Sequence, residues 1–181
     1  MKSMEILTQK ISLGNSCDLI DKSKDVFSPV KEAVTNALDA ISQRQSIGEN
    51  FTPAISVAMH FGTEENLLKE KFIALDFIAI EDNGIGFTSE NLLRFKELGE
   101  KTKGLNNRGT GKIQIFHHFN EISIDSSFVE RNEWNKLNAS WKLPNGEYDA
   151  SLIKIGAQAD RRTIIKISNL SGGVGEREFY T

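Results

Sequence analysis

Glu32 and Asn36, four positions apart, are the side chains of this 181-residue sequence whose types and spacing best suit chemistry on a phosphate. At about 100° per residue, Glu32, Asn36 and Asp39 fall on one side of a helix, opposite an apolar stripe. A carboxylate can orient a water molecule for attack, and an amide oxygen is a hard ligand that suits Mg²⁺. A solvated face of an amphipathic helix explains the same residues, so this segment alone leaves both interpretations open.

A second candidate is the turn that follows the apolar run 72–80, with the sequence Asp82-Asn83-Gly84-Ile85-Gly86-Phe87. A carboxylate at the end of a buried strand is costly unless it has a partner. Gly84 and Gly86 permit positive φ and a close approach of a ligand to the backbone. Asp82 is therefore suited to accept a hydrogen bond from an exocyclic amino group such as that of adenine. Ordinary turn chemistry is the alternative, because Asp, Asn and Gly are common in turns.

A third candidate is the glycine-punctuated segment 99–112. A glycine-rich segment that opens a helix offers backbone N–H groups to an anion, and lysines nearby add positive charge. The residues suited to a phosphate there are Lys103, Gly109, Thr110, Gly111 and Lys112. The segment is not a Walker A motif, because Asn106 and Ile113 stand where that motif needs Gly and Ser or Thr. A solvated loop is the competing interpretation.

The elements that must position these residues follow from the spacing of apolar side chains. A helix is predicted from Pro29 to about Arg44, with Ser28 as its N-cap and Pro29 at the favoured first position. Its apolar residues are Val30, Ala33, Val34, Ala37, Leu38 and Ile41. Further helices are predicted over 91–98 and from about Gly111. Strands are predicted over 54–61, 72–80, 121–129, 134–143, 151–155 and 163–168.

Helices dominate the first half of this order and strands the second. The order favours an α+β fold, a two-layer sandwich rather than an alternating parallel fold. We expect one domain over residues 1–181, in which residues 1–25 form an arm or an edge element.

The bulk composition excludes several classes of protein. Hydrophobic residues make up 39% and charged residues 26% of the sequence, with a net charge of −3, which argues against stand-alone binding to nucleic acid. Cys17 is the single cysteine, so an internal disulfide framework is excluded and a reducing compartment is expected. No apolar run approaches the ~18 residues of a membrane span. The expectation is a cytoplasmic protein without a membrane partner.

Taken together, the three candidates resemble the motifs of the GHKL superfamily, which includes DNA gyrase, heat-shock chaperones, histidine kinases and MutL. Residues 32–40, EAVTNALDA, resemble its E-x-x-x-N-x-x-D-A box, and residues 82–87 resemble its D-x-G-x-G motif. Residues 98–103 and 108–112 are similar to its ATP lid, in the style of the MutL and MORC branches. The strand at Thr163 resembles the late strand of the family, although Arg162 stands where the family often has glycine.

The resemblance implies a Bergerat fold, with a mixed, mostly antiparallel sheet covered by helices, and a site for ATP and Mg²⁺. It implies that Glu32 is the general base and that Asn36 holds Mg²⁺. Asp82 would bind the adenine amino group, supported by Thr163 through water. The remaining residues implied at the nucleotide are Asp39, Gly84, Gly86, Lys103, Gly109, Thr110, Gly111 and Lys112.

The resemblance also implies a function. We expect an Mg²⁺-dependent ATPase that works as a nucleotide-driven conformational or dimerisation switch, as a homodimer or within a larger multidomain protein. Hydrolysis is expected to be weak, because the family's downstream transducer domain, which supplies a lysine to the γ-phosphate, is not expected within 181 residues. A histidine-kinase-type phosphotransfer domain and a non-hydrolysing nucleotide sensor are the alternatives. Glu32 before Asn36 favours water activation over phosphotransfer.

Overall fold

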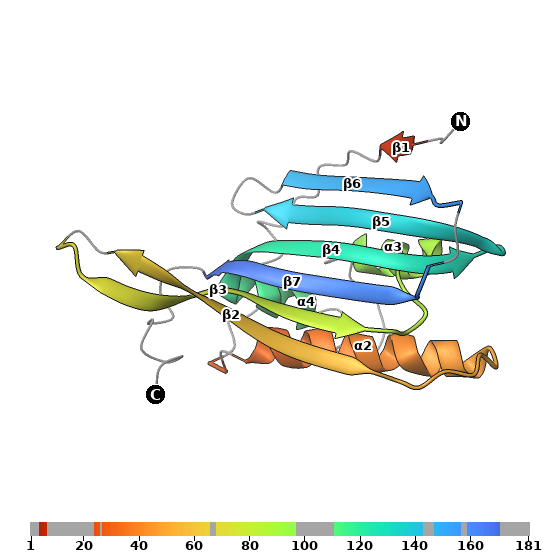
Figure 1. Cartoon of the computed structure of the whole chain (residues 1–181), viewed down its shortest axis with the longest axis horizontal. Helices are drawn as coiled ribbons and strands as arrows, with labels where there is room; N and C mark the ends of the chain where they lie inside the picture. Colours follow the sequence, from red (N-terminus) through yellow and green to blue (C-terminus); the bar gives the residue numbers. More distant parts are fainter. Residues whose placement is uncertain are drawn as a thin grey trace, which may run out of the picture.

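Antiparallel pairing joins all seven strands that the computed structural model describes into one sheet (Figure 1). The described residues are 4–6, 24–25, 27–65, 68–96, 111–142, 147–156 and 159–170. The strand order across the sheet is β1-β6-β5-β4-β7-β3-β2. The strands are β1 (Met4–Ile6), β2 (Ile55–Glu65), β3 (Lys71–Asp82), β4 (Phe119–Glu130), β5 (Glu133–Lys142), β6 (Glu147–Lys154) and β7 (Arg162–Leu170).

In the described part of the chain, three helices lie on one side of this sheet, behind it in the view of Figure 1. They are α2 (Ser28–Ser46), α3 (Ser89–Lys96) and α4 (Gly111–His118). Helix α2 packs against both β3 and α4. Its buried residues are Pro29, Ala33, Ala37 and Ile41. Because three of these four side chains are small, the helix can approach the sheet and its neighbouring helix closely.

The predicted apolar stripe of α2 was correct in period but rotated around the axis. Val30 and Val34 are only partly buried against the core, and Leu38 is 56% exposed. Ser28 is the first helical residue and not the N-cap. The burial that fixes the helix therefore centres on Ala33 and Ala37, where close packing matters more than side-chain size.

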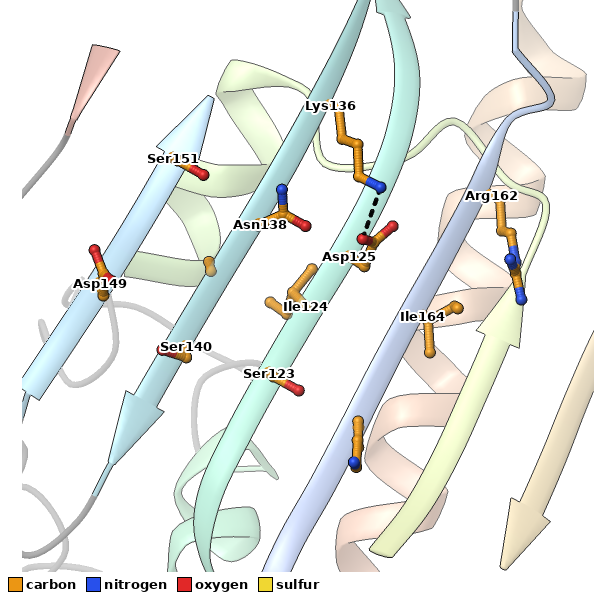
Figure 2. A pocket seen from close by; sticks show the side chains of 12 residues that line it. Ser123, Ile124, Asp125, Lys136, Asn138, Ser140, Asp149, Ser151, Arg162 and Ile164 are labelled. Atoms are coloured by element: carbon orange, nitrogen blue, oxygen red, sulfur yellow. Dashed lines mark ion pairs between the residues drawn. The ribbon is translucent and has the colours of Figure 1, made fainter. Parts of the chain in front are cut away.

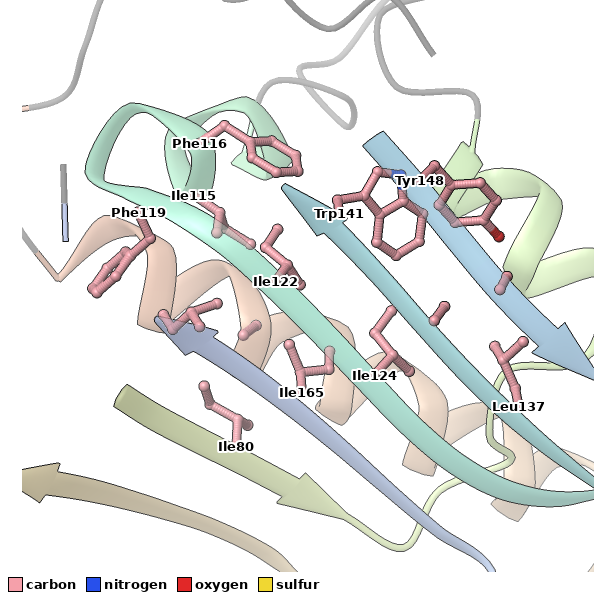
Figure 3. Packing of buried hydrophobic residues seen from close by; sticks show 14 of the residues in the cluster. Ile80, Ile115, Phe116, Phe119, Ile122, Ile124, Leu137, Trp141, Tyr148 and Ile165 are labelled. Carbon is pink, nitrogen blue, oxygen red and sulfur yellow. The ribbon is translucent and has the colours of Figure 1, made fainter. Parts of the chain in front are cut away.

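The core lies between the helices and one face of the sheet (Figure 3). Alternate residues of the inner strands point into it, as the period of two in a strand requires. Rows of branched side chains cross the sheet through the strand pairing, and the rings of Trp141 and Tyr148 meet at 4.4 Å across β5 and β6. The inner rows are formed by Ile78, Ile80, Ile122, Ile124, Ile165 and Ile167, each at most 6% exposed.

The predicted fold class was wrong. The structure is predominantly β. Among the described residues the sheet pairs only antiparallel strands, and the described helices, of 19, 8 and 8 residues, do not form a full covering layer. The predicted α+β sandwich, with a mixed sheet covered by helices, overestimated how much of the sheet the helices cover. Most strands run past the apolar segments that predicted them, because backbone pairing continues through polar residues such as Thr63 and Glu81.

No helix in the described part of the chain has the length and apolar character needed to cross a membrane.

Candidate functional site

Three polar side chains lie side by side on the buried face of the sheet, on β3, β7 and β4. Thr163 of β7 pairs with Asp82 of β3 on one side and with Ser126 of β4 on the other. Asp82 is 4% exposed, Thr163 3% and Ser126 0%. The preceding row is apolar, since Ile165 pairs with Ile80 and Ile124. Between these two rows, the buried side chains of the three strands thus change from hydrocarbon to hydroxyl and carboxyl groups.

Asp82 is the one ionisable member of the polar row. Burial raises the pKa of its carboxyl group to about 6; the Gly84 amide acts in the opposite direction and the charge of Glu81 raises it further. The Gly84 N–H donates to Asp82 Oδ1 at 2.8 Å. Within the described residues it is the one hydrogen-bond donor to this carboxyl group. A buried carboxylate with so few donors is a strong acceptor for an N–H group of a ligand.

The two hydroxyl groups of the row are hydrogen-bonded to each other, with Ser126 Oγ and Thr163 Oγ1 2.9 Å apart. Ser126 Oγ also accepts from the Phe87 N–H at 3.2 Å. Thr163 was predicted at this site and Ser126 was not. The signal for Ser126 was its parity in the strand, because Ile122 and Ile124 lie on the buried face four and two positions earlier.

The glycine turn after Asp82 packs directly on the C-terminal half of α2. The Ile85 N–H donates to the Ala40 carbonyl at 3.0 Å. A Cβ atom on Gly84 would lie 2.5 Å from the Ala40 carbonyl carbon. Gly86 has φ +86°, and a Cβ atom there would lie 2.5 Å from the Phe128 Cβ. Gly84 therefore needs to be glycine because of its close contact with α2. Gly86 needs to be glycine because of its positive φ and its close contact with Phe128.

The predicted helix residues precede Ala40, the contact of this turn, along α2. Ala40 contacts the glycine turn. Along the helix axis, Asn36 lies ~6 Å before Ala40, about one helical turn, and Glu32 lies ~12 Å before it, about two helical turns. Glu32 and Asn36 are half-buried, and Asp39 is exposed. Since positions i and i+4 are neighbours on a helix, Asn36 lies on the flank of α2 that the turn contacts.

The predicted lid falls mostly on parts of the chain that the structure does not describe. Lys103, Gly109 and Thr110 lie outside the described residues. Gly111 and Lys112 form the first turn of α4, and α4 packs against α2. The structure therefore brings Asp82, Gly84, Gly86 and Thr163 together, with Asn36 one helical turn away.

Metal ligation at this site would rest on one amide group. Among the described residues, no group of three or more His, Cys, Asp or Glu side chains is arranged to hold a metal ion. Mg²⁺ commonly binds through one or two protein oxygens, with water and substrate phosphates completing its shell. Asn36 has the chemistry for such a contribution.

The opposite face of the sheet carries a shallow polar hollow of about 580 Å³ (Figure 2). Residues of β4, β5, β6 and β7 line it. Its charges are largely paired: Lys136 meets Asp125 at 3.0 Å, and Arg162 donates to both carboxylate oxygens of Glu81 at 2.7 and 2.8 Å. None of the predicted site residues that the structure describes lines this hollow, so the candidate site is on the helical side of the sheet.

Comparison with known proteins yields a likeness of fold. No family model matches the chain, and no curated protein matches it. A solved structure described as "Crystal Structure of N terminal domain of a DNA repair protein" is similar, with a TM-score of 0.50 and 18% sequence identity over 94% of this chain. The chain spans 42% of the length of that structure. At this identity the likeness concerns the fold alone.

Proposed function

We propose that this chain binds an adenine nucleotide with Mg²⁺ and hydrolyses it slowly, as a nucleotide-driven switch of the GHKL type. The observation that carries the proposal is the buried carboxyl group of Asp82 at the end of β3. It lies beside two hydroxyl groups and a glycine turn that is packed on α2.

The chemistry of the polar row supports recognition of an adenine base. The exocyclic amino group of adenine would donate to the Asp82 carboxylate, whose raised pKa reflects burial with few donors. Such a hydrogen bond would offset part of the free energy that burial of the carboxylate costs. Thr163 and Ser126 add hydroxyl groups that can donate or accept at ring nitrogens, directly or through water.

The order of residues along α2 supports a triphosphate that runs from the turn toward the N-terminal half of the helix. Asn36 would contribute its amide oxygen to Mg²⁺, which would bridge the phosphates. Glu32, a further turn away, would hold the attacking water as general base. By resemblance, Lys103, Gly109, Thr110, Gly111 and Lys112 would close on the phosphates, in the manner of segments ordered by a γ-phosphate.

A calorimetric titration with Mg²⁺ and a non-hydrolysable ATP analogue tests the binding. We expect saturable binding by the wild-type protein and a loss of at least tenfold in affinity for Asp82→Asn, whose amide loses the charged acceptor. Asp125→Asn is the matched control, because Asp125 is a carboxylate on the opposite face, and its affinity should be unchanged. Wild-type protein that does not bind the analogue contradicts the proposal.

Turnover separates hydrolysis from the alternatives. Glu32→Ala should abolish phosphate release from ATP while it leaves binding of the analogue intact. Transfer of labelled phosphate to a protein, in place of its release, would instead favour phosphotransfer. Binding without either product would favour a sensor. Unchanged turnover in Glu32→Ala would reject Glu32 as the base.

A further inference from the structure

Three charged residues form a compact cluster behind the glycine turn. Glu49 follows α2 and accepts from two arginines: Arg44 Nε donates to its Oε2 at 2.8 Å, and Arg161 donates to its Oε1 through Nη2. The side chain of Arg44 is 16% exposed and that of Arg161 is 7% exposed. Burial alone would raise the pKa of Glu49, but hydrogen bonds from Arg44 and Arg161 outweigh it and lower that pKa.

The same two arginines hold the backbone of the turn. Arg44 Nη1 donates to the Asn83 carbonyl at 2.6 Å. Arg161 Nη1 donates to the Ile85 carbonyl at 3.2 Å, with the Val129 carbonyl at 3.5 Å. The two carbonyls that flank Gly84 are thus each bound by a guanidinium group, and one carboxylate joins the two guanidinium groups.

This arrangement fixes the turn without neutralising Asp82. The groups that shift the pKa of Asp82 are its burial, the Gly84 amide and Glu81, so neither guanidinium group acts as its counter-ion. The planar guanidinium group of Arg161 bonds a carboxylate and a carbonyl at once, which a lysine cannot reproduce in the same geometry. The cluster therefore separates two tasks, holding the backbone of the turn and leaving the carboxylate available.

We infer that Arg44, Glu49 and Arg161 are positioning residues, which hold the turn of Asp82, Gly84 and Gly86 in the geometry that receives the adenine base. This inference rests on the proposed function for its ligand, but the fixing of the turn can be measured without any ligand.

Arg162 provides a matched control one residue away. It also forms a two-bond pair with a carboxylate, that of Glu81, but its side chain is 54% exposed on the opposite face. Arg161→Met and Arg162→Met therefore remove the same charge and nearly the same volume from neighbouring positions of one chain. Glu49→Gln is the second test variant, since it keeps the shape of the side chain and removes the charge that joins the arginines.

Hydrogen exchange of the full chain tests the fixing of the turn. We expect the amides of Gly84 and Ile85 to exchange at least tenfold faster in Arg161→Met and in Glu49→Gln than in the wild type, with no change in Arg162→Met. Ile122→Ala serves as a control for lost stability, because Ile122 is fully buried in the part of β4 distant from the turn. Exchange at Gly84 and Ile85 that rises equally in Ile122→Ala and Arg161→Met overturns the inference.

Calorimetry with the ATP analogue and Mg²⁺ tests the link to the ligand. The folded Arg161→Met and Glu49→Gln proteins should bind at least tenfold more weakly, while Ile122→Ala and Arg162→Met retain wild-type affinity. Faster exchange of the turn with unchanged affinity overturns the positioning role. If the wild type binds no nucleotide, the proposed function fails, and the exchange experiment still decides whether the cluster fixes the turn.

Discussion

Two neighbouring rows on the same face of the sheet have opposite physical character. Ile80, Ile165 and Ile124 form an apolar row, and Asp82, Thr163 and Ser126 form the row beside it. Both are almost completely buried, yet the first gains free energy from burial and the second loses it at its carboxylate. The difference indicates that the polar row is maintained for a reason other than stability. The experiments below either break this contrast or sharpen it.

The largest effect is expected in the apolar row. Ile80→Ala removes a side chain that is 1% exposed and should lower the free energy of unfolding by roughly 2–5 kcal/mol, from lost transfer energy and the cavity left behind. Urea unfolding measures it. Leu38→Ala, at a side chain that is 56% exposed, should change stability by less than about 0.5 kcal/mol. A small loss for Ile80→Ala would mean that the apolar row is not close-packed.

Asp82→Asn, two residues further along the same strand, should raise the free energy of unfolding instead of lowering it. The folded-state pKa of Asp82 is about 6, above its unfolded value near 3.8. The folded state therefore binds more protons between these values, and this group lowers stability as pH rises through 6. The loss is roughly 3 kcal/mol for a shift of about two units. Asparagine does not titrate, so we expect Asp82→Asn to be more stable by roughly 2 kcal/mol at pH 8, after a weaker bond from Gly84 is allowed for.

Urea unfolding from pH 3.5 to pH 8 measures this effect. The difference between Asp82→Asn and the wild type should grow from pH 4 to about pH 7 and then level off. Asp125→Asn, at a side chain that is 45% exposed on the other face, is the control and should show no such growth. A wild-type protein that gains stability across this range relative to Asp82→Asn would show that the carboxylate is stabilising.

The smallest effect is expected at the hydroxyl pair. Ser126→Ala removes the acceptor of the Phe87 N–H and the partner of Thr163, so it should cost roughly 1–2 kcal/mol, about 0.5–1 kcal/mol for each of the two hydrogen bonds lost. Ser127→Ala, the next residue of β4 on the opposite face, should be neutral within about 0.5 kcal/mol. Equal losses at the two serines would remove the distinction between the two faces.

Much of the candidate site could be predicted from short segments of sequence, whereas the residues that long-range strand pairing adds to it could not. The helix that carries Glu32 and Asn36, the buried strand before Asp82 and the turn after it each follow from local periodicity and turn chemistry. Ser126 joins the site through the register of β4 on β7, which depends on pairing between residues 37 positions apart. Strand parity marks Ser126 as buried, but no local pattern shows which residue it pairs with.

The arginine cluster was beyond prediction for the same reason. Arg161 and Glu49 are 112 residues apart, and only the complete sheet brings them together. In the sequence, Arg162 departs from the GHKL motif that this segment resembles, whereas nothing in the sequence marks its neighbour Arg161. Strand parity separates them: Arg162 points to the open face with Glu81, while Arg161, just before β7, lies behind the turn. The error in fold class arose because apolar runs mark only the centres of strands.

The most direct test of the account is the pKa of the Asp82 carboxyl group, measured by carbon NMR without nucleotide and at saturation with Mg²⁺ and the ATP analogue. We predict a value of about 6 in the free protein and a clear fall on binding, because an N–H donor favours the charged form. Affinity should weaken correspondingly as pH falls through 6. A pKa that is the same in the free and saturated proteins would contradict the claim that this carboxylate receives the base.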